Sequence, residues 1–332
     1  MTGASPVSVV TRDLVSTIIP VFNRAGQLRE AVASVLGQTY RPIEIIVVDD
    51  GSTDATGPTL DELARAHPDT IRALHRENAG PGPAREAGRR IARGEFIQHL
   101  DSDDLLLPSK FELQVAGLRA HPECGVSYGM TRYHRAGEPR SQTPLKRTGE
   151  RIPAMFPALL VSRWWDTSTP LYRREVVDRV GPWPDLCINE DWVYDCRVAN
   201  HCGPLHYVPE FVSEQGAHDG PRLSGGSFRD AAKLRARVAA RFLILEEARR
   251  AGVEPESPEM QTFSRSAFLL SRQCGAAGLP EESKRLFDLA LETAGEASRG
   301  GLDFRLYAVA AETLGWSRTG SLACYLDRLR RS

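Results

Sequence analysis

One stretch decides the fold: Ile43-Glu44-Ile45-Ile46-Val47-Val48-Asp49-Asp50-Gly51-Ser52-Thr53-Asp54. Its first six residues form a nearly continuous β-branched run, which is typical of a strand buried on both faces of a parallel sheet. The polar residues that follow are those of a turn that caps the next helix. One carboxylate is enough for a cap, so the second acid of the Asp49-Asp50 pair indicates a function.

The alternation of strand and helix continues through the first hundred residues. Further strands are predicted at residues 15–21, 71–75 and 95–100. Leu28, Val32, Val35 and Leu36 recur at helical spacing, with Asn23 as the expected cap, residues 82–91 form a helix lined by small residues, and Pro108 opens another helix. This alternation predicts a parallel, doubly wound sheet, which binds its ligands at the carboxyl ends of the strands.

Polar clusters follow each predicted strand. The most charged of them is Leu100-Asp101-Ser102-Asp103-Asp104, with three carboxylates in four residues. Acids this close repel one another, so they are tolerated best where a cation or solvent compensates. Mg²⁺ and Mn²⁺ prefer oxygen ligands and bridge well to phosphates. The alternative is a solvated acidic helix start with an aspartate as N-cap.

Composition indicates a globular protein with one large domain and a smaller one in its 332 residues. The chain has 42 basic and 43 acidic residues and a net charge of -1, which argues against a nucleic acid partner. No apolar run approaches the roughly 18–20 residues that span a bilayer, and residues 1–11 lack the pattern of a secretory signal. The six scattered cysteines predict reduced thiols in a cytoplasmic protein.

Several motifs in one order resemble glycosyltransferase family 2. They are Val15 to Asn23, Ser34 to Tyr40, Ile46 to Asp54, Asn78 to Gly80 with Ala84-Arg85, Gly94 to Ile97, and Leu100 to Asp104. The resemblance covers roughly residues 14–220. It implies the A-type glycosyltransferase fold, a Rossmann-like domain with a mostly parallel sheet, and transfer of a sugar from a nucleoside-diphosphate sugar with inversion at the anomeric carbon.

The resemblance also implies a donor site. Its donor-binding residues are Pro20, Val21, Asn23, Asp50, Arg85, Asp101 and Ser102. Asp50 is expected to contact the nucleobase, Asp101 to lie near the ribose, and Asp103 to hold the Mn²⁺ or Mg²⁺ that bridges the diphosphate. Arg85 supports the acidic loop or the phosphates, or is only structural, and Asp104 caps a helix or supports the loop. His218 matches loosely as a further metal or diphosphate contact, the alternative being an exposed loop histidine.

An acceptor hydroxyl has a high pKa, so direct displacement needs one positioned base, which is worth typically ~10²–10⁴-fold in rate. The resemblance assigns that role to Asp191 in Glu190-Asp191-Trp192, with Glu190 beside it and Trp192 as a wall for a sugar ring. The alternative is a pair of acids that favours a helix N-terminus. Residues 167–174 are expected to form the strand that frames the acceptor pocket. Trp164 and Trp165 just before it are expected to stack on a sugar, or to pack in the core.

Residues 213–226 are rich in glycine, proline and polar residues and predict a loop. We therefore expect residues 1–226 to form the transferase domain and residues 227–332 an all-helical domain. Apolar stripes predict the helices, among them Leu234, Val238, Phe242 and Leu245, then Leu302, Leu306, Val309, Ala310 and Leu314, and last Leu322, Tyr325, Leu326 and Leu329. Homo-oligomerisation through these helices is one open role. Arg328, Arg330 and Arg331 leave peripheral association with the inner face of the membrane as another.

Two functions from other classes are alternatives to glycosyl transfer. One is a nucleotide-sugar-binding or scaffold protein whose helical region recruits a partner, and the presence of Asp50, Asp101, Asp103 and Asp191 together argues against it. The other is a nucleotidyltransferase, which needs a glycine-rich phosphate loop that residues 20–26 lack. The acceptor stays open among a saccharide, a lipid-linked sugar, a small molecule and a peptide, and so does the donor sugar.

Overall fold

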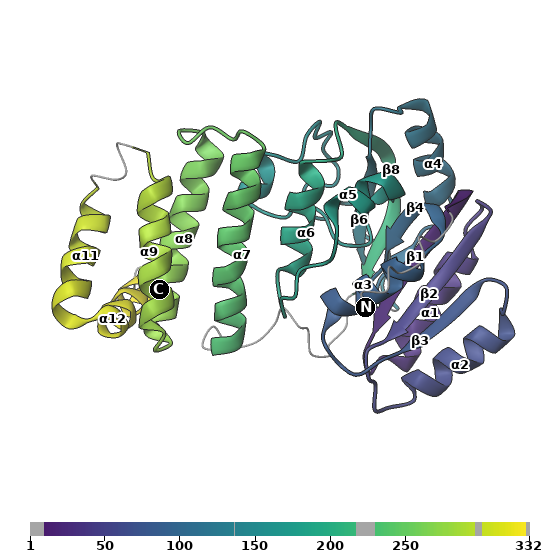
Figure 1. Ribbon diagram of the computed structural model, residues 1–332, viewed down its shortest axis with the longest axis horizontal. Coiled ribbons are helices and arrows are strands. Elements are labelled where there is room, and N and C mark those ends of the chain that lie inside the picture. The colour runs from purple at the N-terminus through teal and green to yellow at the C-terminus, as the bar shows by residue number, and fades with distance from the viewer. Residues whose placement is uncertain (1–9, 136, 217–229, 296–300, 330–332) are drawn as a thin grey trace, which may run out of the picture. The chain divides into compact units, whose positions relative to one another are not determined.

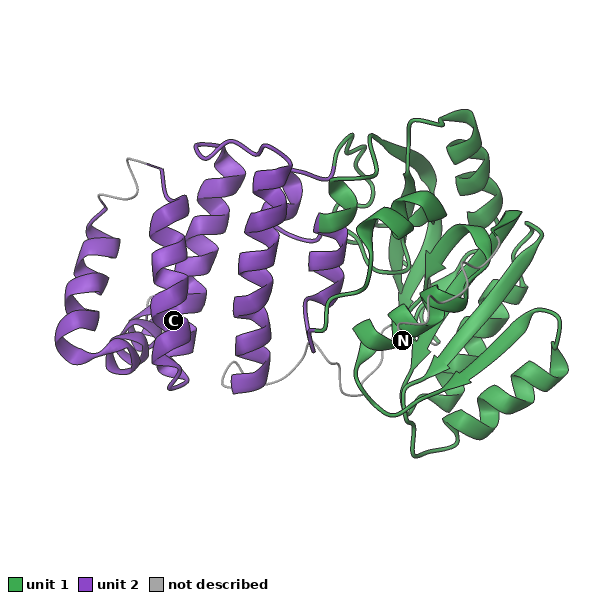
Figure 2. Cartoon of the chain, viewed as in Figure 1, with its two compact units in different colours: residues 1–154, 164–185, 197–219 green, residues 155–163, 186–196, 220–332 purple. Residues whose placement is uncertain are grey.

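The computed structural model describes residues 10–135, 137–216, 230–295 and 301–329 (Figure 1). The chain forms two compact units (Figure 2). One consists of residues 1–154, 164–185 and 197–219, and the other of residues 155–163, 186–196 and 220–332. The domain boundary expected at residue 226 falls outside the described residues and stays a prediction.

The first unit is built around a sheet. Its elements are β1 (Thr11–Val21), α1 (Ala25–Leu36), β2 (Ile43–Asp49), α2 (Thr56–Ala66), β3 (Ile71–His75), α3 (Pro81–Ile91), β4 (Gly94–His99), β5 (Leu105–Leu106), α4 (Lys110–Ala120), β6 (Val126–His134), β7 (Leu171–Arg173), α5 (Arg174–Val180) and β8 (Leu205–Gly216). The four strands expected in the first hundred residues are confirmed as β1 to β4.

The eight strands form one sheet in the order β3-β2-β1-β4-β7-β6-β8-β5. The half made of β1 to β4 is parallel, as expected, whereas β7 runs antiparallel to both β4 and β6 and β5 runs antiparallel to β8. The sheet is therefore mixed. In the parallel half Val21 is paired with Asp49 and Ile18 with His99, so the loops after β1, β2 and β4 leave the same edge.

Every residue of β2 is buried, which agrees with its β-branched sequence. One face of the parallel half packs against α1 and α2 through side chains such as Val32 and Leu60, whereas α4 packs against strands β6, β7 and β8. On the opposite face α3 approaches closely, since a Cβ at Gly88 would lie 2.5 Å from Cγ2 of Ile18. This close approach explains the small residues of that helix.

Three local expectations were wrong, and one of the two alternatives given for Asp104 is excluded. Residues 213–216, expected in a loop, end strand β8, because Ser213 hydrogen-bonds Thr131 (2.8 Å) and Glu214 pairs with Arg132 (2.7 Å) within the sheet. Asn23 does not cap α1. Asp104 does not cap α4 either, whose first turn follows Ser109. The strand expected over residues 167–174 is confined to β7.

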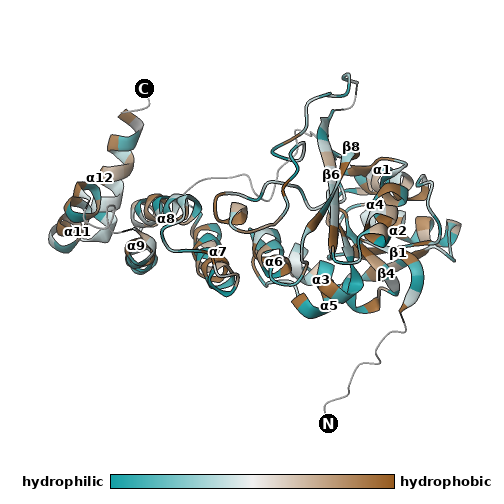
Figure 3. Ribbon diagram, turned by 90° about the horizontal axis from the view of Figure 1, so that it is seen from above, coloured by the Kyte–Doolittle hydropathy of each residue, from teal (hydrophilic) through white to brown (hydrophobic). Residues whose placement is uncertain are grey.

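The second unit is helical. It contains the 3₁₀ helix η1 (Ala158–Leu160), the start of α6 (Glu190–Ala199), and α7 (Ala231–Arg250), α8 (Pro258–Ala276), α9 (Pro280–Thr293), α11 (Leu302–Leu314) and α12 (Trp316–Leu329). Figure 3 shows hydrophobic residues in each of α7, α8 and α9. The all-helical prediction is confirmed.

Two of the predicted apolar stripes are exposed rather than buried. On α12 the exposed side chains are Leu322, Tyr325, Leu326 and Leu329. On α11 the buried side chains are Phe304, Tyr307 and Ala311. Leu302, Leu306, Val309 and Leu314 are exposed, because the aromatic residues pack inward instead. In the part of the chain that the structure describes, we find no helix with the length and apolar character of a membrane span.

Candidate functional site

The loop after β1 is tied to the loop after β2. The amide nitrogen of Asn23 donates to Oγ of Ser52 (2.9 Å), and its side-chain oxygen accepts from the amide of Thr53 (2.8 Å). Pro20 and Val21 are buried within β1, whereas Phe22 is 45% exposed. Phe22 is therefore the apolar side chain that this loop presents to a ligand.

Asp50 ties the loop after β2 to the loop after β3. Its carboxylate is buried and accepts from the amides of Gly80 (2.7 Å) and Ala79 (3.1 Å), and Nε of Arg76 lies 3.2 Å away. No sequence motif pointed to Arg76. A nucleobase that bonds Asp50 would have to share the carboxylate with these groups.

The neighbouring acid, Asp49, organises its own turn. Its Oδ1 accepts from the amide of Ser52 (3.0 Å), and its Oδ2 lies 3.1 Å from Nδ1 of His75. Nε2 of His75 lies 3.1 Å from Asp61. The hydrogen bond to Asp49, helped by the one to Asp61, raises the pKa of His75 above its ordinary value.

The two partly exposed acids of the loop after β4, Asp101 and Asp103, each pair with an arginine. Asp101 accepts from Nη2 of Arg85 (2.7 Å), and Asp103 lies 2.5 Å from Nη1 of Arg24. Arg85 is buried, with its guanidinium carbon 4.6 Å from the centre of the Trp183 ring. Arg85 thus supports the acidic loop, which is one of the two roles expected for it. The carboxylates of Asp101 and Asp103 remain 34% and 19% exposed, whereas Ser102 is buried.

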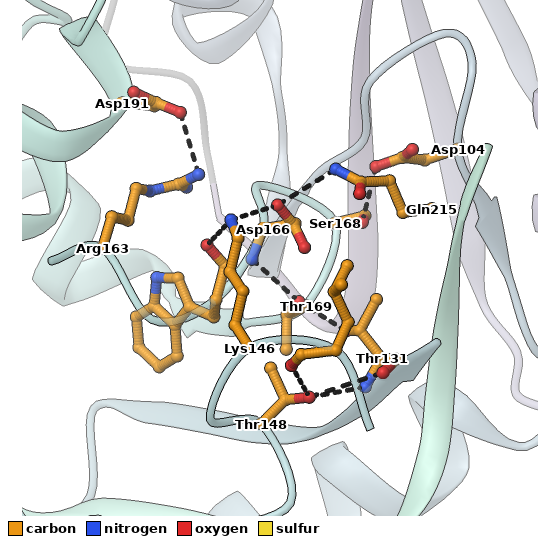
Figure 4. A network of polar contacts seen from close by, with 12 residues as sticks. Asp104, Thr131, Lys146, Thr148, Arg163, Asp166, Ser168, Thr169, Asp191 and Gln215 are labelled. Atoms are coloured by element: carbon orange, nitrogen blue, oxygen red, sulfur yellow. Dashed lines mark hydrogen bonds and ion pairs between the residues drawn. The ribbon is translucent and has the colours of Figure 1, made fainter. Parts of the chain in front are cut away.

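Asp104, the last acid of this loop, belongs to a buried polar network (Figure 4). It accepts from the hydroxyl of Ser168 (2.8 Å) and the amide of Gly216 (3.2 Å). Burial, together with the negative charges of Asp101, Asp103 and Asp166, raises the pKa of Asp104 well above its ordinary value. The carboxylates around Asp104 thus favour its protonated, neutral form.

Asp166 belongs to the same network and was missed by the sequence reasoning. Its Oδ1 binds Nζ of Lys146 (2.5 Å) and Nε2 of Gln215 (3.2 Å). Its Oδ2 is buried and has no hydrogen-bond partner among the described residues. Its only signal in the sequence was its position, after two tryptophans and before the polar run Thr167-Ser168-Thr169.

The segment that follows the acidic loop is anchored from α1 and the turn after it. Oγ of Ser34 accepts from the amide of Leu106 (3.1 Å). Gln38 donates from Nε2 to the carbonyl of Leu107 (2.8 Å), and its Oε1 accepts from the amide of Phe111 (3.1 Å). Both residues belong to the motif Ser34 to Tyr40, for which the family resemblance implied no role.

A divalent cation fits the chemistry of the acidic loop. Among the described residues there is no group of three or more His, Cys, Asp and Glu side chains that would hold a metal ion alone. An ion bound through Asp101 or Asp103 would complete its coordination with oxygens of a phosphate ligand or of water, as Mg²⁺ commonly does. The oxygen donors of Asp101 and Asp103 and their partial exposure suit such an ion. His218, expected as a further ligand, lies outside the described residues.

The acidic pair expected at the acceptor opens α6 and belongs to the second unit. Asp191 is 28% exposed on its side chain, whereas Glu190 is buried. Arg163, also in this unit, contacts Asp191 through Nη1 (2.8 Å) and the buried Asp195 through Nε (2.6 Å). Figure 4 shows the Arg163 guanidinium directed at Asp191. Neither Arg163 nor Asp195 was expected from the sequence.

The three tryptophans expected at the acceptor differ in exposure. Trp164 and Trp165 are fully buried in the first unit, where their ring centroids lie 4.4 Å apart and that of Trp164 lies 4.9 Å from Tyr128. Because both rings are buried, neither presents a surface to a sugar. The alternative role, packing in the core, fits both residues. Trp192 is partly exposed and donates from Nε1 to the carbonyl of Leu159 (2.8 Å).

Residues 16–180 match the family model described as Glycosyl transferase family 2. An uncharacterized glycosyltransferase of Nostoc sp. is 32% identical over 187 residues, which cover 52% of this chain and 58% of that protein. The chain spans between 14% and 58% of the length of the curated relatives it matches.

Two solved structures have a similar fold. One is S. aureus TarS 1–349 in complex with UDP-GlcNAc, with a TM-score of 0.63 at 19% identity over 94% of this chain and 92% of that chain. The other is the mannosyltransferase PcManGT from Pyrobaculum calidifontis in complex with GDP-Man and Mn²⁺, with a TM-score of 0.52 at 19% identity over 99% and 91% of the two chains. At such identities the likeness shows the fold alone.

Proposed function

This chain belongs to glycosyltransferase family 2 and has the A-type glycosyltransferase fold, and from that premise we propose that it transfers a sugar from a nucleoside-diphosphate sugar to an acceptor hydroxyl, with inversion. The observation that carries the proposal is the acidic loop after β4, at the edge of the sheet where doubly wound folds bind their ligands. UDP-GlcNAc and GDP-Man are bound by the two structural neighbours, which supports a donor of this class.

The donor occupies the edge formed by the loops after β1, β2 and β4. Phe22 and Asn23 wall the base, and Asp50 bonds it while holding the loop of Ala79 and Gly80. Asp101 binds the ribose with Arg85 behind it. This assignment is supported by the contacts that join the loop after β1 to the loops after β2 and β4, and the loop after β2 to the loop after β3.

Asp103 would hold Mn²⁺ or Mg²⁺ against the diphosphate, with Asp101 or His218 as further ligands. The ion would act as a Lewis acid that neutralises the charge of the leaving nucleoside diphosphate. An ion on Asp103 would compete with the Arg24 guanidinium for this carboxylate, and Arg24 would then be available to a phosphate oxygen. The buried Asp104 keeps the loop in place through Ser168 and Gly216.

Asp191 removes the proton of the acceptor hydroxyl. Its partial exposure supports this role, because a base must reach the acceptor, whereas the buried Glu190 stabilises the start of α6. Arg163 orients the Asp191 carboxylate through a hydrogen bond from Nη1. Trp192 provides a wall for the acceptor.

The remaining partner predictions concern the second unit. Exposed apolar side chains on α11 and α12, among them Leu306, Leu322 and Tyr325, support homo-oligomerisation through these helices. Light scattering on the parent and on a Leu306→Glu variant tests it, and a monomeric parent would refute it. Cytoplasmic location and peripheral membrane association stay predictions.

The function is tested by incubating the purified chain with a panel of uridine, guanosine and thymidine diphosphate sugars and measuring release of the nucleoside diphosphate. We expect release from at least one donor in Mn²⁺ and none in excess chelator. Asp103→Asn should abolish it, whereas Asp69→Asn, a change of an exposed aspartate away from the site, should not. Full activity in chelator would refute the role of the metal.

A further inference from the structure

The second unit contains a pocket to which the proposed function assigns no ligand. Its volume is about 320 Å³, and it lies between the start of α6 and helices α7 and α8. The polar side chains that line it are Asn189, Trp192, Arg237, Arg241, Ser266 and Gln273. None of the described residues that line the pocket is acidic, and two are arginines, so its lining is positively charged.

Arg241 is the most unusual of these residues. Its guanidinium carbon lies 4.9 Å from the centre of the Trp192 ring and 5.5 Å from that of Phe263. Its Nη1 is buried and has no hydrogen-bond partner among the described residues. Buried polar groups almost always have a partner, and a buried charge without one is costly. This nitrogen therefore lacks an acceptor that a ligand can supply.

The charge on Arg241 persists at neutral pH. Burial lowers the pKa of Arg241, to about 10, and the nearby Arg237 acts in the same direction. A group with this pKa is still almost fully protonated at pH 7. The pocket thus combines an ionised guanidinium with hydrogen-bonding groups on Asn189, Ser266 and Gln273 and an apolar lining from α8.

We infer that this pocket binds an anionic oxygen group, a phosphate or a carboxylate, carried by the acceptor. A guanidinium matches both groups because it donates two parallel hydrogen bonds from one plane. Trp192, which lines the pocket, directly follows Asp191 in the first turn of α6, so the pocket and the expected base share one turn of this helix. Binding of the anion stands on the pocket alone, and only its assignment to the acceptor rests on the proposed function.

The competing account is that Arg241 only packs between two aromatic rings, as arginines do elsewhere in proteins. It predicts a pocket without affinity for anions. The two accounts differ in a binding measurement that requires no catalysis.

The test is calorimetric titration of the full chain with glucose 6-phosphate, glucuronate, inorganic phosphate and acetate, with glucose as the neutral match. We expect at least one of the two organic anions to bind and glucose not to bind. Arg241→Gln should weaken that binding at least tenfold, and Ser266→Leu, which fills the pocket and keeps the arginine, should also weaken it. Arg235→Gln, a change on α7 of an exposed arginine that pairs with Glu282, should leave it unchanged. Binding that is equal in the parent and in both pocket variants, or absent from the parent, would overturn the inference.

Circular dichroism and a melting curve show whether Arg241→Gln is folded. If it is not folded, the titration is judged on Arg241→Lys and Ser266→Leu instead. Arg241→Lys keeps the charge but loses the planar fork. Release of nucleoside diphosphate from donor sugars separates the two proposals. Donor turnover without anion binding refutes this inference alone, whereas anion binding without turnover on any donor refutes the proposed function alone.

Discussion

Replacing Gln38 by methionine should destabilise the first unit and loosen the acidic loop. Methionine keeps the length and nearly the volume of glutamine, so no large cavity forms. The two hydrogen bonds donated by Nε2, to Leu107 and Ser34, contribute about 0.5–1.5 kcal/mol each. The amide of Phe111, in the first turn of α4 where helix amides lack an internal partner, loses its acceptor at a further ~1–3 kcal/mol. We expect a total of about 2–6 kcal/mol.

The assay is urea unfolding followed by circular dichroism, with hydrogen exchange of peptides covering residues 105–120 to assign the loss to this unit. The matched control is Thr39→Val, because the Thr39 hydroxyl also contacts this segment, through Glu112 (2.7 Å), but is exposed. The control should cost less than about 1 kcal/mol. Affinity for a nucleoside diphosphate should fall in Gln38→Met and not in the control. Equal costs for the two variants, or unchanged exchange in residues 105–120, would refute the reasoning.

Three further predictions test other parts of the account. Asp191→Asn should lower turnover by roughly 10²-fold or more with donor binding unchanged, and Glu190→Gln should cost less; near-parent turnover in both would place the base elsewhere. Arg24→Gln should raise the affinity for Mn²⁺ about 2–5-fold, because the carboxylate of Asp103 no longer has to leave a partly exposed ion pair, and titration calorimetry measures it. The pKa of His75 is raised by its aspartate partners, so its stabilising contribution is present below about pH 6.5 and is lost as the pH rises through the raised value. Urea midpoints at pH 6 and pH 9 should therefore differ more in the parent than in His75→Gln, and the effect should be small because the side chain is half exposed.

The parallel half of the sheet was predictable because each of its strands carries a local signal. The β-branched run before Asp49, and the polar turn after it, predict a strand and its end without knowledge of the partners. The second half was not predictable in this way. Strand β7 lies between β4 and β6 in the sheet although 36 residues separate the end of β6 (His134) from its first residue (Leu171). Such pairing depends on long-range register rather than on local pattern.

Polar residues were also misread where the sheet pairs them. The sequence predicts a loop at Ser213 and Glu214 because isolated polar side chains favour loops. In the sheet, Thr131 and Arg132 on β6 provide their hydrogen-bond and ion-pair partners. The same limit applies to the site. The acids of the loop after β4 were expected from the sequence, whereas Arg24, Arg163, Asp166 and Arg241 were not, because an ion pair or a missing partner is visible only when distant segments are brought together.

The central claim is that the acidic loop after β4 holds the diphosphate of a nucleotide donor through a divalent cation. The most direct measurement is calorimetric titration of the chain with UDP and with GDP, in Mn²⁺ and in excess chelator, for the parent and for Asp103→Asn. The account predicts that at least one of the two nucleotides binds the parent in Mn²⁺, and that binding is lost in chelator and in Asp103→Asn. Failure of both nucleotides to bind, or equal affinity in the parent and Asp103→Asn, would contradict it.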